Sequence, residues 1–284
     1  MIRKYFLTVV ISLSTTSYVA AQVNILNATK VDEIGKQTDA RIAADNDEPL
    51  AYGYIDERDI LWSKVVWEFV DLNQKINLPY YFPIDTSNIS NDRRSLFDSL
   101  MKGIRKGSIK NVYSDSFFTS KMSTQDINER LVDNRILGDD TIPYVISTED
   151  IEGYMMKGLW YFDKRLGELK YRLLGLSPMG KDIQALGTDS DDGEIFEFFW
   201  VFYPETRDIL HKSKVFNPKN VSQPISYDHL LNARRFNAVI VREENVYGNR
   251  AIADYIRGNA LFQLLEADRI KESIRNKEID MWNY

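Results

Sequence analysis

The chain has no cysteine among its 284 residues and only two histidines. Without cysteine it can form no disulfide, no thiolate zinc site and no thiol nucleophile. The sequence also lacks glycine-rich phosphate loops, dinucleotide fingerprints and the Gly-x-Ser-x-Gly elbow of hydrolases. His211 and His229 belong to no catalytic motif, and we interpret both as structural or surface residues. A catalytic triad assembled from distant positions stays open, because spacing alone does not exclude it.

The chain also has fewer basic than acidic residues, 36 against 42, which gives a net charge of −6. Nucleic-acid binding depends on neutralising phosphates, and adhesion to anionic lipid headgroups depends on the same positive charge. The composition therefore predicts that the chain binds neither. Its stability must come from packing, for which 16 Tyr and 14 Phe supply large apolar side chains.

No apolar run reaches the roughly 20 residues that a membrane-spanning helix needs. The first run, residues 6–13, follows Arg3 and Lys4 and gives way to small residues, which is the pattern of a secretory signal peptide. We predict cleavage between Ala21 and Gln22. Removing 21 residues leaves 263, and because that segment carries two basic and no acidic residues, the net charge becomes −8. The sequence therefore predicts an exported protein without direct membrane insertion. It has no cysteine after the cleavage site that could carry acyl chains.

Composition divides the exported chain into two parts. Residues 22–54 are polar and rich in Asp, Asn and Ala, and we predict that they form a mobile arm. Residues 55–284 form the folded domain, with a further boundary left open near residues 135–150. The first half of this domain reads as helical. The sequence predicts four elements there. They are a helix capped by Asp56 or Asp59 and ending at Asn73, an extended linker Leu78–Pro83, a helix from Asn91 to Gly107, and a helix from the Ser123/Asp126 capping box to Val132.

After Pro143 the hydrophobic period changes from helical to alternating. The elements predicted there are a hairpin of Tyr154–Asp163 and Glu168–Leu176, a strand Ile195–Tyr203, a helix Pro204–Lys214, a helix Tyr227–Arg235 capped by Ser226, and a strand Ala238–Glu243. A helical tail occupies residues 249–284, with a buried turn at Leu261–Leu265 and a narrow apolar stripe at Ile270 and Ile274. The fold class is therefore α+β, with N-terminal helices, a central antiparallel β-sheet with a hairpin, and C-terminal helices.

Three groups of residues could carry chemistry or binding. The acidic loop 187–194 resembles a calcium loop, but Phe199 occupies the position of the bidentate Glu, so an exposed turn is favoured and cation binding stays open. Asp150 and Glu152 would face the same way on a strand. Together with the aromatic run Trp160–Phe162 they support an alternative function as a glycan-binding protein or glycoside hydrolase. The pair Arg234 and Arg235 could hold a carboxylate of a partner or an internal Asp.

Several segments together resemble the GldN/PorN family of gliding-motility and type IX secretion proteins. The resemblance covers nearly everything after about Ile55 and does not reach the polar arm. The segments that carry it are Trp62–Trp67, Ile76–Pro83, Gly158–Pro178, Phe199–Pro204, Asp208–Lys212, Val215–Pro218, Pro224–Phe236, Glu243–Gly248 and Asp280–Tyr284.

The resemblance implies a non-catalytic periplasmic component of a type IX secretion machine of Bacteroidetes-type bacteria, with no cofactor. Its expected partners are a GldK/PorK-type outer-membrane lipoprotein, with which it forms a ring at the inner face of the outer membrane, and a GldM/PorM-type motor subunit. Self-association within the ring is also implied. The residues that we predict for partner interfaces are Trp160, Tyr161, Arg234, Arg235, Ile270 and Ile274.

Overall fold

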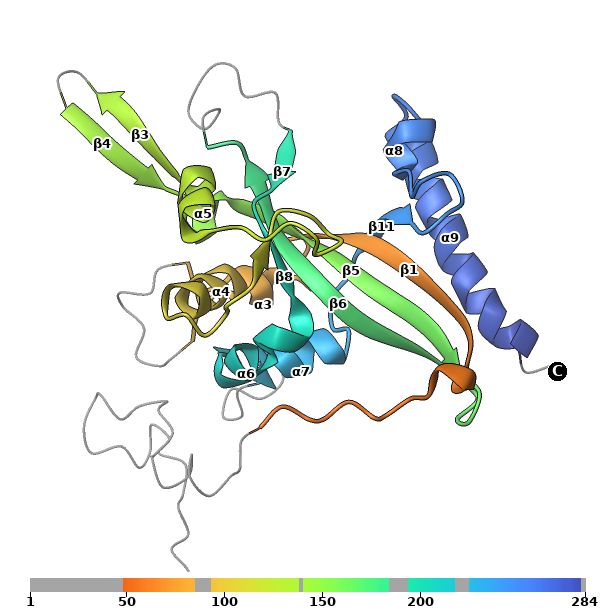
Figure 1. Cartoon of the computed structure of the whole chain (residues 1–284). Helices are drawn as coiled ribbons and strands as arrows, with labels where there is room; N and C mark the ends of the chain where they lie inside the picture. The colour runs from red at the N-terminus through yellow and green to blue at the C-terminus, as the bar shows by residue number, and fades with distance from the viewer. Residues whose placement is uncertain (1–47, 85–92, 138–139, 184–193, 218–224, 282–284) are drawn as a thin grey trace, which may run out of the picture. The chain divides into compact units, whose positions relative to one another are not determined.

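The computed structural model describes residues 48–84, 93–137, 140–183, 194–217 and 225–281 (Figure 1). The predicted cleavage site at Ala21 and Gln22, most of the predicted arm, the acidic loop 187–193 and the helix cap predicted at Asn91 lie outside these ranges. Over the described residues, no helix is both long enough and apolar enough to cross a membrane.

An antiparallel sheet of seven strands lies at the centre of the described residues, in the order β11-β1-β5-β6-β8-β2, with β7 paired to β6. Its longest strands, β5 (Ile151–Asp163) and β6 (Glu168–Lys181), form the predicted hairpin, which is confirmed. The turn between them ends at Gly167, whose φ of 64° falls in the left-handed region that glycine adopts without a steric cost. The α+β fold class is likewise confirmed.

The strand β1 (Ile60–Asp71) corrects the prediction of a helix in this segment. β1 pairs with β5 on one side and with β11 (Val239–Glu243) on the other. Val66 and Trp67 are adjacent and are both buried, so the strand is covered on both faces. A strand buried on both faces carries a nearly continuous apolar run, which periodicity alone cannot distinguish from a buried helix.

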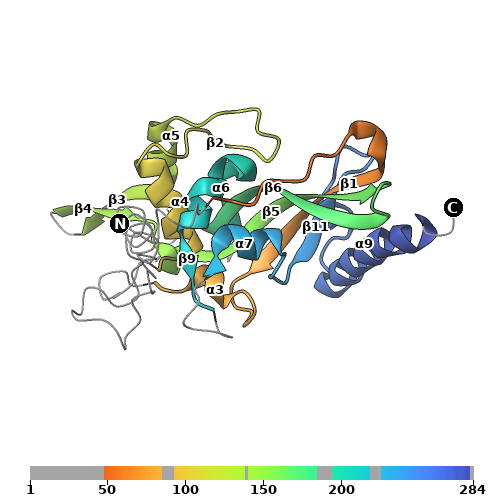
Figure 2. The same ribbon diagram turned by 90° about the horizontal axis from the view of Figure 1, so that it is seen from below.

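The helices before β11 pack on one face of the sheet, as Figures 1 and 2 show. The predicted capping box of Ser123 and Asp126 is confirmed, as is the cap at Ser226, whereas the cap of the second helix is Ser95. The predicted linker at Leu78–Pro83 instead contains a helical turn, because a proline is tolerated in the first turn of a helix. The helices are α3 (Leu78–Tyr81), α4 (Leu96–Arg105), α5 (Thr124–Leu131), α6 (Tyr203–Lys212) and α7 (Tyr227–Asn232), with the short 3₁₀ turns η2 (Glu57–Asp59) and η3 (Thr148–Asp150).

The remaining strands are short. The strand predicted over Ile195–Tyr203 is instead two short strands, β7 and β8. The first pairs with the end of β6, and the second pairs with both β6 and β2. A separate two-stranded hairpin, β3–β4, follows α5 and extends away from the central sheet (Figure 1). The bounds are β2 Val112–Tyr113, β3 Val132–Leu137, β4 Asp140–Val145, β7 Ile195–Glu197, β8 Trp200–Phe202, β9 Lys214–Val215 and β10 Ile225–Ser226.

The chain ends in α8 (Ile252–Tyr255) and the long helix α9 (Ala260–Met281). Ile270 and Ile274 are buried and pack in one cluster with Val66 of β1 and Ile240 of β11. The predicted narrow stripe therefore attaches α9 to the sheet. The prediction of a buried turn at the start of this helix is wrong, because Leu261 and Leu265 are 64% and 53% exposed.

Candidate functional site

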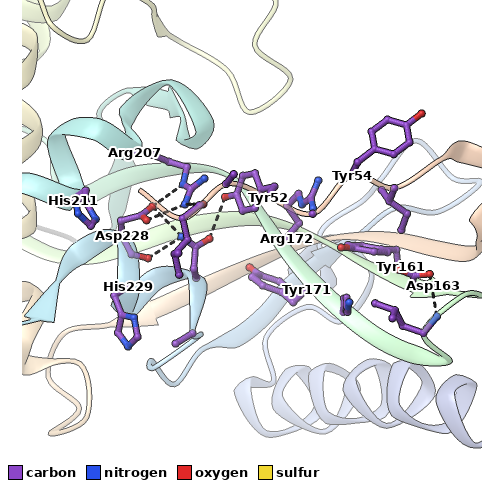
Figure 3. A pocket seen from close by; sticks show the side chains of 18 of the residues that line it. Tyr52, Tyr54, Tyr161, Asp163, Tyr171, Arg172, Arg207, His211, Asp228 and His229 are labelled. Carbon is purple, nitrogen blue, oxygen red and sulfur yellow. Dashed lines mark hydrogen bonds and ion pairs between the residues drawn. The ribbon is translucent and has the colours of Figure 1, made fainter. Parts of the chain in front are cut away.

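A cavity of about 670 Å³ opens beside the β5–β6 hairpin (Figure 3). Its walls come from four parts of the chain: residues 50–55, the hairpin itself, α6 and α7. Tyr161, which the sequence analysis predicts at an interface, lies in this wall and is 6% exposed. His211 and His229 also line the cavity, from α6 and α7.

Tyr52 is held between two arginine side chains in this cavity. The guanidinium carbons of Arg207 and Arg172 lie 4.2 and 4.3 Å from the centre of its ring. Its hydroxyl donates a hydrogen bond of 3.1 Å to Asn232 of α7. Burial raises the pKa of Tyr52, so the hydroxyl stays protonated and able to donate at neutral pH. The interactions hold the end of the predicted arm against the domain.

Asp228 connects the helices that form the floor of the cavity. Its carboxylate accepts two hydrogen bonds from Arg207, of 2.8 and 3.0 Å, one of 2.7 Å from Tyr203 and one of 2.9 Å from Asn232. Arg207 also donates to the carbonyl oxygen of Leu50, at 2.6 Å. A bidentate Arg–carboxylate pair of this kind fixes geometry as well as charge. The ion pair therefore joins α6, α7 and the arm at one point.

Both carboxylates that line this cavity, Asp163 and Asp228, have hydrogen-bond partners within the fold. Asp163 accepts hydrogen bonds from the backbone N–H groups of Arg165 and Leu166, and so shapes the hairpin turn. Asp228 is saturated by the four bonds described above. General acid–base chemistry needs a carboxyl group free to exchange a proton with a substrate. Within the described ranges, no group of three His, Asp or Glu side chains could hold a metal ion.

Trp160 and Arg234, two of the residues predicted at an interface, contact each other and are partly buried. The Arg234 guanidinium lies 4.9 Å from the Trp160 ring and 4.8 Å from the Tyr171 ring. It also pairs with Glu68 of β1, whose side chain is 1% exposed. The sequence analysis left two partners open for Arg234, a carboxylate of another chain and an internal Asp. The structure shows an internal carboxylate, which belongs to Glu68 and not to an Asp. Arg235, beside Arg234, is exposed.

The other predicted site residues have structural contacts. Asp150 completes a capping box with Ser147 at η3 and accepts a hydrogen bond of 2.5 Å from Tyr144. Ile270 and Ile274 are buried against the sheet, so another chain would meet different side chains of α9. Whether any predicted residue takes part in an interface stays a prediction.

Sequence reasoning missed Lys157, a buried lysine on the face of the sheet opposite the helices. Its ammonium donates a hydrogen bond of 2.8 Å to the Ser116 carbonyl and lies 4.8–5.3 Å from the rings of Trp67, Phe117 and Phe118. Burial lowers the pKa of Lys157. The contacts attach the 114–120 loop to the sheet. The sequence did carry a signal for both Lys157 and Glu68, because each is a single charged residue within an apolar strand.

Residues 55–283 match the family model described as "Gliding motility associated protein GldN". The chain belongs to the GldN family. This GldN-family match runs from before β1 almost to the end of the chain, so it includes the sheet, the cavity walls from α6 and α7, and the whole of α9. Tyr52, in the arm, lies outside it. No protein with a curated description matches the chain. The GldN-family chain is thus a component of the gliding-motility and type IX secretion machinery.

Proposed function

We propose that this chain is a non-catalytic structural component of the type IX secretion and gliding-motility machinery, working in the periplasm. In this proposal it assembles into a ring with a GldK/PorK-type lipoprotein at the inner face of the outer membrane, and contacts the periplasmic part of a GldM/PorM-type motor subunit. The observation that carries the proposal is the family match over residues 55–283. The predicted signal peptide supports the location, and the lipoprotein would supply the acyl anchor.

The side chains of the cavity support a structural role. Arg207 and Asp228 form a buried ion pair whose partners are all within the chain. Tyr52 occupies the space between Arg207 and Arg172, where a ligand would otherwise stack. Residues 50–55 therefore form one wall of this cavity and are held there by contacts within the chain.

The alternative function, glycan binding or glycoside hydrolysis, rests on the tyrosines that line this cavity. A glycosidase needs two carboxyl groups on opposite sides of the scissile bond, about 5–10 Å apart, and one must be free to give up a proton. Asp163 and Asp228 are both engaged in the fold, as described above. The structural role is favoured on this ground. Calorimetry with peptidoglycan fragments tests the alternative, and saturable binding lost in a Tyr161→Ala variant would support it.

Co-expression with the GldK/PorK-type lipoprotein of the same bacterium tests the proposal. The full chain, tagged at its C-terminus, should be cleaved before Gln22 and should purify from the envelope with the lipoprotein as an assembly far larger than a one-to-one complex. N-terminal sequencing and electron microscopy measure these two outcomes. A chain that is purified as a free monomer, leaving the lipoprotein behind, would contradict the proposal.

A further inference from the structure

Arg172 of β6 is the cation of the cavity that the described residues leave without an anionic partner. The lining cations that have a carboxylate partner are Arg165 with Asp59 (2.9 Å), Lys170 with Glu168 (3.7 Å) and Arg207 with Asp228 (2.8 Å). Asp163, the second carboxylate of the lining, lies 3.9 Å from Arg165. Because Asp163 is paired with Glu168 across the hairpin, it lies four residues, or about 13 Å along the strand, from Arg172. The carboxylates of the cavity are therefore all engaged with other groups.

The N–H groups of Arg172 also lack hydrogen-bond acceptors. Its guanidinium carbon lies 4.3 Å from the centre of the Tyr52 ring and 5.7 Å from that of Tyr161 (Figure 3). Both rings attract the positive charge, but neither replaces a carboxylate or carbonyl acceptor. None of the five N–H donors of this guanidinium is bonded to an acceptor within the described ranges. Since the residue is partly buried in the cavity wall, its donors can bind an acceptor that enters from outside.

The wall formed by residues 50–55 offers main-chain groups beside this arginine. Arg207 donates to the carbonyl oxygen of Leu50 at 2.6 Å, and Arg165 donates to that of Tyr54 at 2.9 Å. Between these two anchors, residues 51–53 belong to no helix or strand. Their backbone N–H and C=O groups make no hydrogen bond to the described part of the chain. A segment that is held at both ends and unpaired between them can pair with a second extended chain.

The chemistry of the cavity favours a peptide carboxylate as ligand. The guanidinium fork binds a carboxylate through two parallel hydrogen bonds. One uncompensated positive charge matches the single charge of a carboxylate, whereas a phosphate group carries about two negative charges at neutral pH. The volume of about 670 Å³ lies within the range of about 300–1,000 Å³ that is usual for ligand sites. A peptide, unlike a glycan, presents N–H and C=O groups at the spacing of an extended segment, so the unpaired groups of residues 51–53 favour a peptide.

We propose that this cavity binds an extended peptide segment, with a carboxylate of the peptide on Arg172 and its backbone beside residues 51–53. The carboxylate belongs to an Asp or Glu side chain or to the C-terminus of the peptide. Tyr161, on the other side of Arg172 from the arm, packs against the peptide side chain next to this carboxylate. The inference goes beyond the proposed function, because it assigns a ligand to a cavity whose ion pair and arm contacts have structural roles.

Fluorescence anisotropy with three pools of short labelled peptides tests the site, using the chain from Gln22 to Tyr284. The pools have the same random composition and differ only in their carboxylates. One has a fixed internal Glu and an amidated C-terminus, one has Gln in place of this Glu and an amidated C-terminus, and one has Gln and a free C-terminus. At least one carboxylate pool should saturate below about 1 mM, and the pool without a carboxylate should not. Saturation of the first or of the third pool identifies a side-chain or a C-terminal carboxylate. Equal binding of all three pools, or no saturation by any of them, would overturn the inference.

Two matched variants assign the binding to Arg172. Arg172→Gln should weaken the peptide affinity by roughly tenfold or more, because the charge-assisted hydrogen bonds are lost. Arg250→Gln is the control, because Arg250 also stacks over tyrosines, Tyr247 at 4.9 Å and Tyr255 at 5.9 Å, but lies outside the cavity. It should leave the affinity unchanged. An Arg172→Gln variant with the wild-type circular dichroism spectrum and the wild-type affinity would refute the proposal.

Photo-crosslinking locates the peptide on the wild-type chain and so does not depend on how a variant folds. Peptides of the saturating pool that carry a benzophenone should label residues 50–55 or the β5–β6 hairpin, as mass spectrometry of the digest would show. Labelling confined to other segments would overturn the inference, as would chitin oligosaccharides that saturate the cavity while all peptides fail. The proposed function is tested separately, since purification with the lipoprotein does not require that the isolated chain binds these peptides.

Discussion

The ion pair between Arg234 and Glu68 gives the sharpest test of how the domain is held together. Glu68 lies on β1 in the middle of an apolar strand, and its side chain is 1% exposed. Arg234 follows α7 and reaches it from 166 residues away in the sequence. Its backbone has a φ of 49°, a left-handed conformation that costs on the order of 1 kcal/mol in a residue with a side chain. The domain thus accepts local strain to place this guanidinium.

The two partners should differ in how much their loss destabilises the domain. Arg234→Met leaves a fully buried carboxylate without its cation, and removing one partner of a buried pair costs about 3–5 kcal/mol. Glu68→Gln keeps an oxygen that accepts a hydrogen bond, and Arg234 is 26% exposed and keeps its three aromatic neighbours. Glu68→Gln should therefore lower the free energy of unfolding by only about 1–2 kcal/mol. The double variant should be more stable than Arg234→Met alone, because the buried charge has been removed.

Urea unfolding of the mature chain, followed by tryptophan fluorescence, measures these differences. In thermal unfolding, a loss of about 3 kcal/mol corresponds to a fall of about 6–12 °C in melting temperature for a domain of this size. Methionine, like arginine, carries a Cβ and meets the same steric cost in the left-handed region, so the comparison reports on the rest of the side chain. The reasoning fails if Glu68→Gln is the more damaging change. It also fails if Arg234→Met melts like the wild type and loses its lipoprotein partner, as an interface residue would.

Three further outcomes follow from the geometry. Ile270→Asp should lower the free energy of unfolding by about 3 kcal/mol, because it buries a charge, whereas the exposed control Ser273→Asp should change it by less than about 0.5 kcal/mol in the same urea titration. Tyr52→Ala should release residues 48–56 from the domain and so increase protease cleavage within them while the β5–β6 hairpin stays intact, as limited proteolysis followed by mass spectrometry would show. Burial raises the pKa of Asp115, but hydrogen bonds from its own loop more than offset this and hold the pKa below its ordinary value. The carboxylate therefore stabilises the loop above a pH of about 4, and this contribution is lost as the pH falls through the lowered pKa. Asp115→Asn should destabilise the domain at pH 7, and the difference from the wild type should shrink as the pH falls below about 4, as urea titrations over this pH range would show.

Local signals in the sequence predicted the elements whose structure depends on neighbouring residues. The hairpin β5–β6 carries its turn chemistry in a few residues ending at Gly167, and the caps at Ser123 and Ser226 act within three residues. The same holds for the narrow stripe of Ile270 and Ile274, which helical spacing reveals directly. These features could be predicted because their causes lie within one turn of the chain.

The errors arise where distant segments decide the outcome. β1 was predicted as a helix because sheet neighbours and packing on both faces remove the alternation that marks a half-buried strand. Leu261 and Leu265 were predicted to be buried because apolar residues in a run usually are, yet no segment among the described residues covers them. Arg234 could be recognised as an ion-pair residue, but not assigned to Glu68, since no local pattern links positions so far apart.

Buried charged side chains attach the peripheral segments of this domain to its sheet and helices. Glu68 holds the segment after α7 through Arg234, and Lys157 holds the 114–120 loop by its ammonium. Arg207, paired with Asp228, holds the arm at the Leu50 carbonyl and at Tyr52. Such contacts add little net stability compared with apolar packing, but each fits a single geometry, and breaking one leaves a buried charge uncompensated. In a chain without cysteine they fix loop and arm positions as cross-links would, so single substitutions at these charges should displace one segment each while the central sheet persists.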